Sequence, residues 1–260
     1  MKAKVFCKMK AKGKDKILNF VCPAVTVAVI LLLWTVAAIA ADSDYILPSV
    51  GKTVAKAISL LGSGEFYAAL GGTLARVFIA FLSSFTIAFV LAFLSYKNGT
   101  AKKFVAPFIR VLRALPTVAV VLLLLFWTNS RVAPVVVTML VVLPTLYTDL
   151  CGAFSGVDKD AVKMCRAFCV PEKRVFFKVV LPQITPNALY AAGAGLSLNL
   201  KLMVAAEVLA QTARSLGYLL NSAKVYFEIA EMLALVTFTV LLGVITESVF
   251  SALAKKAGSR

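Results

Sequence analysis

Long blocks of apolar residues recur along the chain, and they constrain its fold more than any other feature. The first block runs from Ile17 to Ala41, and the later ones are separated by short charged segments. A helix needs about 20 apolar residues to cross the hydrocarbon core of a bilayer. Hydrophobic residues make up 61% of the chain, against roughly 45–50% in soluble domains. The sequence therefore predicts a membrane protein and argues against a water-soluble fold.

We expect an all-α membrane protein with about six transmembrane helices. The first block contains Ala38 and Ala40, which resemble a signal-cleavage site, but it is longer than the apolar region of a signal peptide, so we predict an uncleaved helix. Residues 42–72 form an external connection with one surface helix, and Asn129–Arg131 forms the turn of a hairpin between the third and fourth spans. The expected spans are 17–41, 73–95, 111–127, 132–150, 187–210 and 229–253.

The distribution of positive charge predicts the orientation in the membrane. The formal net charge is +16, and seven lysines lie between Lys2 and Lys16. Basic residues favour cytoplasmic segments, so residues 1–16 and the C-terminus are predicted to be cytoplasmic. The external segments keep a few basic residues, namely Lys52, Lys56, Arg76, Arg131, Arg214 and Lys224. This topological pattern argues against a nucleic-acid partner and for membrane lipid.

The residues that usually bind metals are scarce. The chain has no histidine and five cysteines, and no Cys-x-x-Cys pair occurs. Cys165 and Cys169 are spaced to share a helix face, but a zinc site would need further ligands. We therefore expect no metal and no cofactor in this chain.

The segment between the fourth and fifth spans, residues 157–186, is too long and too charged for a simple turn. Asp158 and Asp160 suit a helix start, Pro171 ends that helix, and a second helix stops before Pro182. One face of the first helix is predicted to hold Val162, Cys165, Ala167 and Phe168. Such a pair of surface helices could adsorb to anionic lipid or could dock onto a partner protein.

Several short motifs give the chain a family resemblance. The loop motif of the resembled family has the form E-A-A-x-x-x-G followed, after a spacer, by a hydrophobic residue and Leu-Pro. Leu181-Pro182 matches its end, which places Cys169 at the glycine and Lys163-Met164-Cys165 at E-A-A. The other matches, in order, are Leu47-Pro48-Ser49, Leu112-Arg113-Ala114-Leu115-Pro116, Ala206-Glu207-Val208-Leu209 and Leu216-Gly217-Tyr218. The sequence resembles the inner-membrane permeases of binding-protein-dependent ABC importers, in the nitrate/sulfonate/taurine branch.

The resemblance implies a permease core over residues 73–256, of the kind found in type I importers, with residues 157–186 as a cytoplasmic coupling loop. It implies a bacterial inner-membrane protein that imports a small, anionic, nitrate-, sulfonate- or taurine-like solute by alternating access. The implied partners are cytoplasmic ATP-binding subunits, a second permease copy in a homodimer, and an extracytoplasmic substrate-binding protein. The residues implied to couple to the ATPase are Lys163, Met164, Cys165, Arg166, Ala167, Phe168, Cys169, Leu181 and Pro182.

ATP hydrolysis is expected in a separate subunit, because the chain has no G-x-x-x-x-G-K-[ST] motif. The chain itself is therefore not expected to be an enzyme. An ion-gradient-driven secondary transporter is the alternative, although the inverted repeats typical of that class are not evident. A membrane-embedded enzyme is disfavoured, because few ionisable residues lie within the spans.

Charged residues inside the fifth span mark a candidate solute pathway, because ionisable groups are costly in the bilayer. The candidates are Asn199, Lys201 and Glu207; alternatively, Lys201 and Glu207 pair with another helix. Arg76 is expected to extend to the membrane interface, with a gate role as the alternative. Two glycines, Gly193 and Gly195, are expected to allow close helix packing. Pro116, Pro134 and Pro144 are expected to kink or end spans.

Overall fold

The computed structural model describes residues 25–43 and 45–258, and these residues form helices and no strand. The all-α prediction is confirmed. The predicted N-terminal segment 1–16 lies outside the described residues, and the first predicted span is described from Val25 as an apolar helix, Val25–Ala41. The chain divides into two compact units. The smaller one holds the residues up to Leu60 together with Ala223–Ala234, and the larger one holds the rest.

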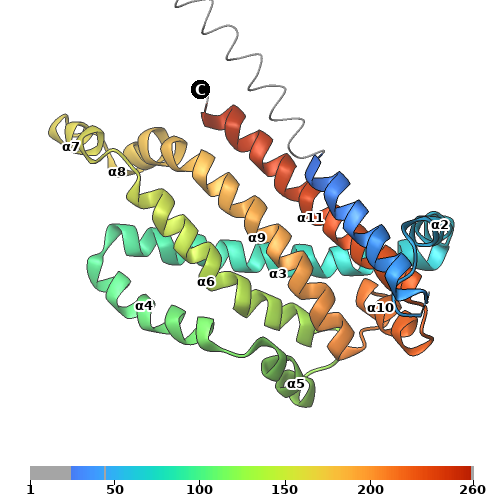
Figure 1. Cartoon of the computed structure of the whole chain (residues 1–260). Coiled ribbons are helices and arrows are strands. Elements are labelled where there is room, and N and C mark those ends of the chain that lie inside the picture. Colours follow the sequence, from blue (N-terminus) through green and yellow to red (C-terminus); the bar gives the residue numbers. More distant parts are fainter. Residues whose placement is uncertain (1–24, 44, 259–260) are drawn as a thin grey trace, which may run out of the picture. The chain divides into compact units, whose positions relative to one another are not determined.

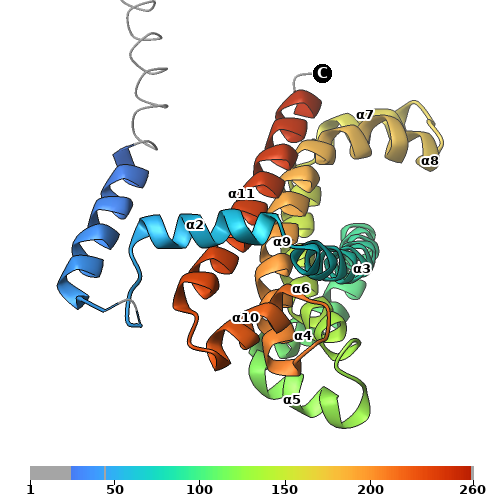
Figure 2. The same ribbon diagram turned by 90° about the vertical axis from the view of Figure 1, so that its right-hand side faces the viewer.

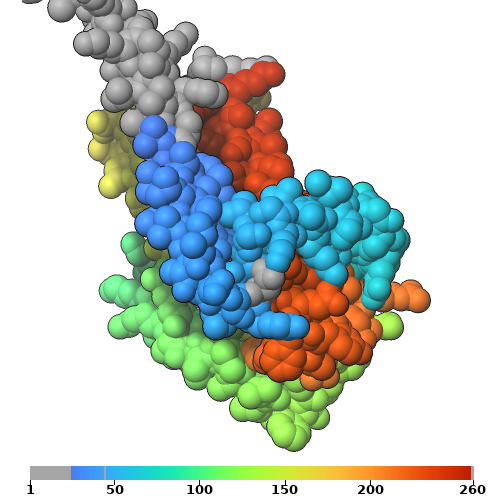
Figure 3. Space-filling model, turned by 45° about the vertical axis from the view of Figure 1, so that its right-hand side comes forward, coloured from blue at the N-terminus to red at the C-terminus, as the bar shows by residue number. Residues whose placement is uncertain are grey.

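Three long helices form the core of the larger unit (Figure 1): α3 (Gly64–Lys97), α6 (Ala133–Ser155) and α9 (Leu181–Ala210). The connecting helices are α4 (Gly99–Ala114), α5 (Thr117–Trp127), α7 (Lys159–Ala167) and α8 (Glu172–Val175), with a π-helical turn, η1 (Phe176–Val180), before α9. Two helices, α10 (Leu216–Val225) and α11 (Ile229–Gly258), contribute to both units. The space-filling view shows α4 and α5, in green, at the surface (Figure 3).

Small side chains on one face of α3 let α6 approach closely. Ala80, Ser84, Ala88 and Ala92 recur every four residues and are buried, which is the spacing of one helix face. Lipid tails are as apolar as the helix side chains, so the hydrophobic effect does not drive helices together within a membrane. Close packing and interhelical hydrogen bonds hold the spans together instead. The Ser84 hydroxyl accordingly donates to the Met139 carbonyl at 3.2 Å. The α3–α6 contact is thus specified by residue size.

Four helices are long and apolar enough to cross a membrane: α3, α6, the continuous helix Glu172–Ala210 and α11. The predicted third span, 111–127, covers the end of α4 and all of α5, two helices that meet at an angle of 92° at Leu115 and Pro116. The expected kink or span end at Pro116 is confirmed. Proline has no N–H to continue the α4 hydrogen bonds, and it holds the preceding residue in an extended conformation. If each bent pair is one span the count rises to five, and the predicted total of about six stays a prediction.

Two further boundaries differ from the predictions. The helix that contains the second predicted span begins at Gly64, before the predicted start at residue 73, because Ser63 caps α3 by accepting from the Phe66 N–H at 3.1 Å. The second helix of the charged segment does not stop before Pro182. The wide turn of η1 lets the Leu181 N–H bond to the Phe176 carbonyl, and a π-helical turn of this kind accommodates irregularities that would break an α-helix. The chain therefore runs as one helix into the fifth span.

The smaller unit contains α2 (Val50–Leu61), in the place where one surface helix is predicted. The Trp34 indole N–H donates to the Pro48 carbonyl at 3.1 Å, which ties the helix Val25–Ala41 to the segment before α2. The Lys56 ammonium donates to Glu228 at 2.6 Å. This hydrogen bond raises the pKa of Lys56 and lowers the pKa of Glu228, so the contact favours the charged form of both side chains.

The expected close packing at two glycines of α9 is confirmed. A β-carbon at Gly193 would lie 2.6 Å from the β-carbon of Phe250 on α11, and one at Gly195 would lie 2.5 Å from the Leu146 side chain on α6. Both distances are shorter than a normal contact. These positions hold α9 between two neighbouring helices, as small residues do in membrane bundles.

Candidate functional site

The segment predicted to couple to an ATPase forms the short helix α7 at one end of the larger unit (Figures 1 and 2). The Asp158 carboxylate accepts from the N–H groups of Asp160 and Ala161 at 2.9 and 3.2 Å. Such a cap satisfies helix N–H groups that lack an intrahelical partner. The Asp158 N–H also donates to Oε1 of Gln183 at 2.8 Å. This bond ties the start of α7 to the first turn of α9.

The faces of α7 are divided differently from the prediction. Val162 and Cys165 are half-buried and pack against the hydrophobic core, as predicted. Ala167 and Phe168 are exposed and do not share that face, because they lie on other sides of the 3.6-residue turn. The Phe168 side chain is 77% exposed and Met164 is 59% exposed. Most of the surface of these two apolar side chains is therefore left uncovered by the described chain.

Cys169 occupies a position that normally requires glycine. Its φ of 54° lies in the left-handed region, which costs about 1–2 kcal/mol for a residue with a β-carbon. The Cys169 N–H bonds to the Arg166 carbonyl and the Val170 N–H to the Cys165 carbonyl, both at 3.0 Å. This pair of bonds is the Schellman arrangement, which usually has glycine at the left-handed residue. The geometry explains physically why the resembled motif has a glycine here.

Leu181 and Pro182, which complete the predicted coupling set, form the first turn of α9. They follow α8 without a break, so α7 is connected to the bundle through a short link and a continuous helix. The end of α3 braces this region. Lys97 forms an ion pair with Glu172 at 2.9 Å and lies 5.5 Å from the ring centroid of Phe93. The sequence pattern gave no signal for this ion pair, because Lys97 and Glu172 are 75 residues apart.

The three candidate pathway residues do not come together at one point. Asn199 is fully buried, and neither polar atom of its amide has a partner in the described structure. Lys201 is exposed, and its stem runs near Gly243 of α11. Glu207 is fully buried and lies eight residues beyond Asn199 on α9. This separation is about 12 Å along the helix at 1.5 Å per residue. The pathway role of these residues stays a prediction.

The Glu207 carboxylate is the centre of a polar cluster that joins α9 to α3. One oxygen accepts from Arg76 Nε at 2.7 Å, and the other accepts from the Thr73 hydroxyl at 2.8 Å and the Gly217 N–H at 3.4 Å. The side chain of Arg76 is only 14% exposed. The Arg76 side chain therefore does not extend into solvent as expected, because the buried Glu207 carboxylate requires a paired cation. Of the two alternatives for Glu207, the structure shows the pairing with another helix, α3.

The same cluster fixes the segment between α9 and α10. Arg76 Nη2 donates to the Arg214 carbonyl at 3.2 Å, and the Leu216 N–H donates to the Thr73 hydroxyl at 2.9 Å. A β-carbon at Gly72 would collide with the Arg214 carbonyl, and one at Gly217 would collide with Glu207. The sequence did hold a signal for this cluster. Arg76 and Glu207 are oppositely charged residues within apolar blocks, and such charges usually pair in membranes.

No group of three or more His, Cys, Asp or Glu side chains within residues 25–43 and 45–258 is arranged to hold a metal ion. Three cysteines of this part, Cys151, Cys165 and Cys169, carry free thiols. The site features of the described chain are therefore the exposed helix α7 at one end of α9 and the buried ion pair at the other end.

Replacing Cys169 with glycine is expected to stabilise α7 by about 1 kcal/mol, because glycine adopts the left-handed conformation without a β-carbon clash. Hydrogen exchange of the α7 amides in the purified chain measures this local stability. The matched control is Cys165→Gly within the helix, which is expected to lower stability by about 1 kcal/mol. Faster exchange of these amides in Cys169→Gly than in the unmodified chain would contradict the interpretation.

Replacing Arg76 with methionine is expected to lower the free energy of unfolding by about 3–5 kcal/mol, because it leaves a buried carboxylate without its cation. Denaturant unfolding in detergent micelles measures the change, and the double variant Arg76→Met/Glu207→Gln is expected to recover part of the loss. The control is Lys97→Met, which removes an exposed pair worth about 0–1 kcal/mol. Equal losses in Arg76→Met and Lys97→Met would show that the buried pair is not a major constraint.

Comparison with known proteins places this geometry in a family. Residues 84–259 match the model of the binding-protein-dependent transport system inner membrane component. The putative aliphatic sulfonates transport permease protein SsuC of Bacillus subtilis is 23% identical, over 88% of this chain and 83% of its own. The taurine transport system permease protein TauC of Escherichia coli is 23% identical, over 76% and 74%.

The fold is similar to that of a solved structure. A chain of the MetNI methionine ABC transporter in an inward-facing conformation superposes with a TM-score of 0.63 at 17% identity, over 73% of this chain and 94% of that one. In this family the membrane component is a transport subunit, and ATPase activity lies in separate subunits. The predicted resemblance is confirmed: the chain belongs to the binding-protein-dependent transport system inner membrane components and is a multi-pass permease of an ABC importer.

Proposed function

We propose that the chain imports a small anionic solute by alternating access, as one of two identical permease subunits, with α7 docked in a groove of a cytoplasmic ATPase subunit. An extracytoplasmic binding protein delivers the solute. The observation that carries the docking assignment is the exposed apolar pair Met164 and Phe168 on a helix that is capped by Asp158 and tied to α9 through Gln183. Exposed apolar anchors of this kind supply most of the binding energy in protein interfaces.

The connection from α7 to the membrane core suits the transmission of movement. Asp158 is bonded to Gln183, and the helix Glu172–Ala210 is continuous from the docking region to Glu207. A displacement of α7 during ATP binding is carried along this helix, because a packed helix moves as a rigid element. At its far end, the Glu207–Arg76 cluster holds the segment before α10. Both ends of α9 therefore take part in the proposed cycle.

The proposed anionic solute is supported by two observations. SsuC and TauC are described as permeases for aliphatic sulfonates and for taurine, and both kinds of solute carry a sulfonate group. Lys201 is an exposed cation within α9, a helix long and apolar enough to span the membrane. A cation inside a span usually faces protein or water, so we assign it to the solute pathway between the two permease copies.

Truncating both Met164 and Phe168 to alanine is expected to weaken association with the ATPase about tenfold or more, because the change removes the apolar anchors of the interface. Co-purification of the ATPase with the tagged permease measures it. Phe104→Ala is the matched control, since Phe104 is 82% exposed on α4, outside the proposed interface. Undiminished ATPase recovery with the double variant would refute the docking role of α7.

Replacing Lys201 with methionine is expected to reduce uptake of a sulfonate anion about tenfold, since a hydrogen bond to a charged group contributes about 1.5–3 kcal/mol. Uptake by the reconstituted complex with its binding protein measures this. Lys178→Met is the control, because Lys178 is exposed in η1, apart from the span interior. Normal uptake by Lys201→Met, at normal levels of complex, would remove Lys201 from the pathway.

A further inference from the structure

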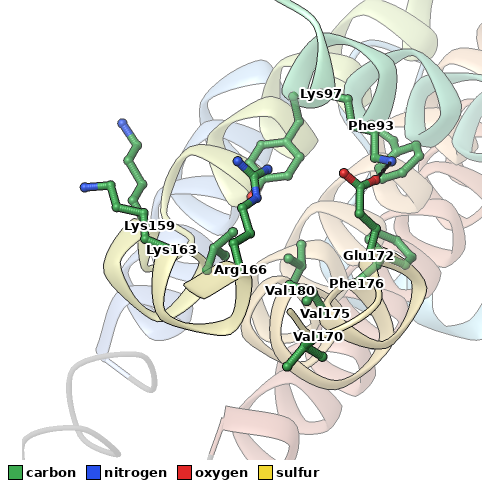
Figure 4. Close-up of a pocket in the computed structure, with 12 residues that line it drawn as sticks. Phe93, Lys97, Lys159, Lys163, Arg166, Val170, Glu172, Val175, Phe176 and Val180 are labelled. Carbon is green, nitrogen blue, oxygen red and sulfur yellow. Dashed lines mark hydrogen bonds and ion pairs between the residues drawn. The ribbon is translucent and has the colours of Figure 1, made fainter. Parts of the chain in front are cut away.

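A pocket of about 350 Å³ lies between α7, the end of α3 and the α8–η1 segment. Its apolar wall includes Val170, Val175 and Val180 together with the rings of Phe93 and Phe176. Figure 4 shows these side chains on one side and the basic side chains of α7 on the other. The pocket therefore presents both an apolar surface and a charged rim.

The rim of the pocket is strongly basic. Four cationic side chains line it, Lys97, Lys159, Lys163 and Arg166, against a single acidic one, Glu172. Glu172 is already paired with Lys97, and Lys163 pairs with Asp160 at 2.9 Å. The Arg166 guanidinium forms no hydrogen bond or salt bridge within the described part of the chain, and it reaches from α7 towards the end of α3 (Figure 4). A planar guanidinium in this position is suited to bind a phosphate oxygen pair.

The pocket lies on a different face of α7 from the proposed docking surface. Lys159, Val162 and Arg166 line the pocket and are spaced by three and four residues, which places them on one face of the helix. Met164 and Phe168 lie on the opposite face and are exposed. An occupant of the pocket therefore leaves the docking surface free, so this inference does not depend on the proposed ATPase contact.

The pocket lies at the end of a spanning helix, where a membrane interface is expected. The pocket begins at Phe93, Tyr96 and Lys97, the last turn of the spanning helix α3. Aromatic and basic side chains at the end of a span are typical of the interface between acyl chains and headgroups. Phe177, in η1 next to the pocket, is 63% exposed. A lipid of the predicted cytoplasmic leaflet would reach the pocket without leaving the bilayer.

We propose that this pocket binds one anionic phospholipid, with the phosphate of the headgroup at Arg166 and an acyl chain along the apolar wall. Basic pockets between helices at the cytoplasmic side of a membrane bind anionic headgroups in this way. A bound lipid bridges α7 and the end of α3, whose ion pair in this region, Lys97–Glu172, is made with α8. The lipid thus adds a contact that holds α7 against the end of α3.

Native mass spectrometry of the purified full chain in detergent tests the proposal, with phosphatidylglycerol and phosphatidylcholine of identical acyl chains as probes. We expect one tightly bound phosphatidylglycerol per chain and weaker binding of phosphatidylcholine. Arg166→Gln is expected to weaken phosphatidylglycerol binding about fivefold, and Arg166→Glu more strongly, because one basic residue near an anionic lipid contributes about 1 kcal/mol. The control Arg174→Gln removes an exposed charge that does not line the pocket, and it is expected to leave binding unchanged.

Three results would overturn the proposal. Equal losses in Arg166→Gln and Arg174→Gln would indicate a diffuse basic surface instead of a site. Equal binding of phosphatidylcholine would show that the headgroup charge has no role. Displacement of the lipid by inorganic phosphate alone would indicate a small-anion site. Circular dichroism of each variant confirms that its helices are intact, and ATPase co-purification, measured separately, keeps this test distinct from that of the docking role.

Discussion

The buried pair of Arg76 and Glu207 is the interaction on which much of the larger unit depends. A carboxylate with no exposed surface is stable only when a cation and hydrogen-bond donors surround it, and here α3 supplies both Arg76 and the Thr73 hydroxyl. The same groups bind the backbone of the segment between α9 and α10. The pair therefore fixes the relative register of α3 and α9 and the conformation of the adjoining segment together.

The opposite end of α9 is built on different physics. There, a capped short helix is held by one backbone-to-Gln183 hydrogen bond, by half-buried Val162 and Cys165, and by the link through α8. The π-helical turn Phe176–Val180 permits the helix to continue past Pro182. Exposed apolar side chains remain on α7, whereas the ion-pair end is satisfied internally. One end of the helix thus has its polar groups paired within the chain, and the other carries exposed apolar side chains, which suits the docking role proposed for α7.

The predictions that succeeded rest on strong local signals. Apolar blocks and the small residues Gly193 and Gly195 identified the helical class and the close packing of α9. The family motif located α7, and its glycine position proved to be a left-handed residue even though Cys169 stands there. Two predictions that failed are the helix stop before Pro182 and the extension of Arg76 to the interface. At Pro182 the local preference was overridden by helix continuity through the π-helical turn. At Arg76 the deciding partner, Glu207, lies 131 residues away in the sequence.

The sequence by itself determined that this chain is a helical membrane protein with a charged loop between apolar spans, because hydrophobicity, charge and loop composition are local properties. Only the tertiary structure decided which partners the ionisable groups have. Arg76 and Glu207 are separated by 131 residues, and Lys97 and Glu172 by 75. Their pairing depends on how α3, α9 and α8 pack, and so does the basic pocket beside α7. Packing of distant segments is set by the shapes of whole helix faces, which no single stretch of sequence contains.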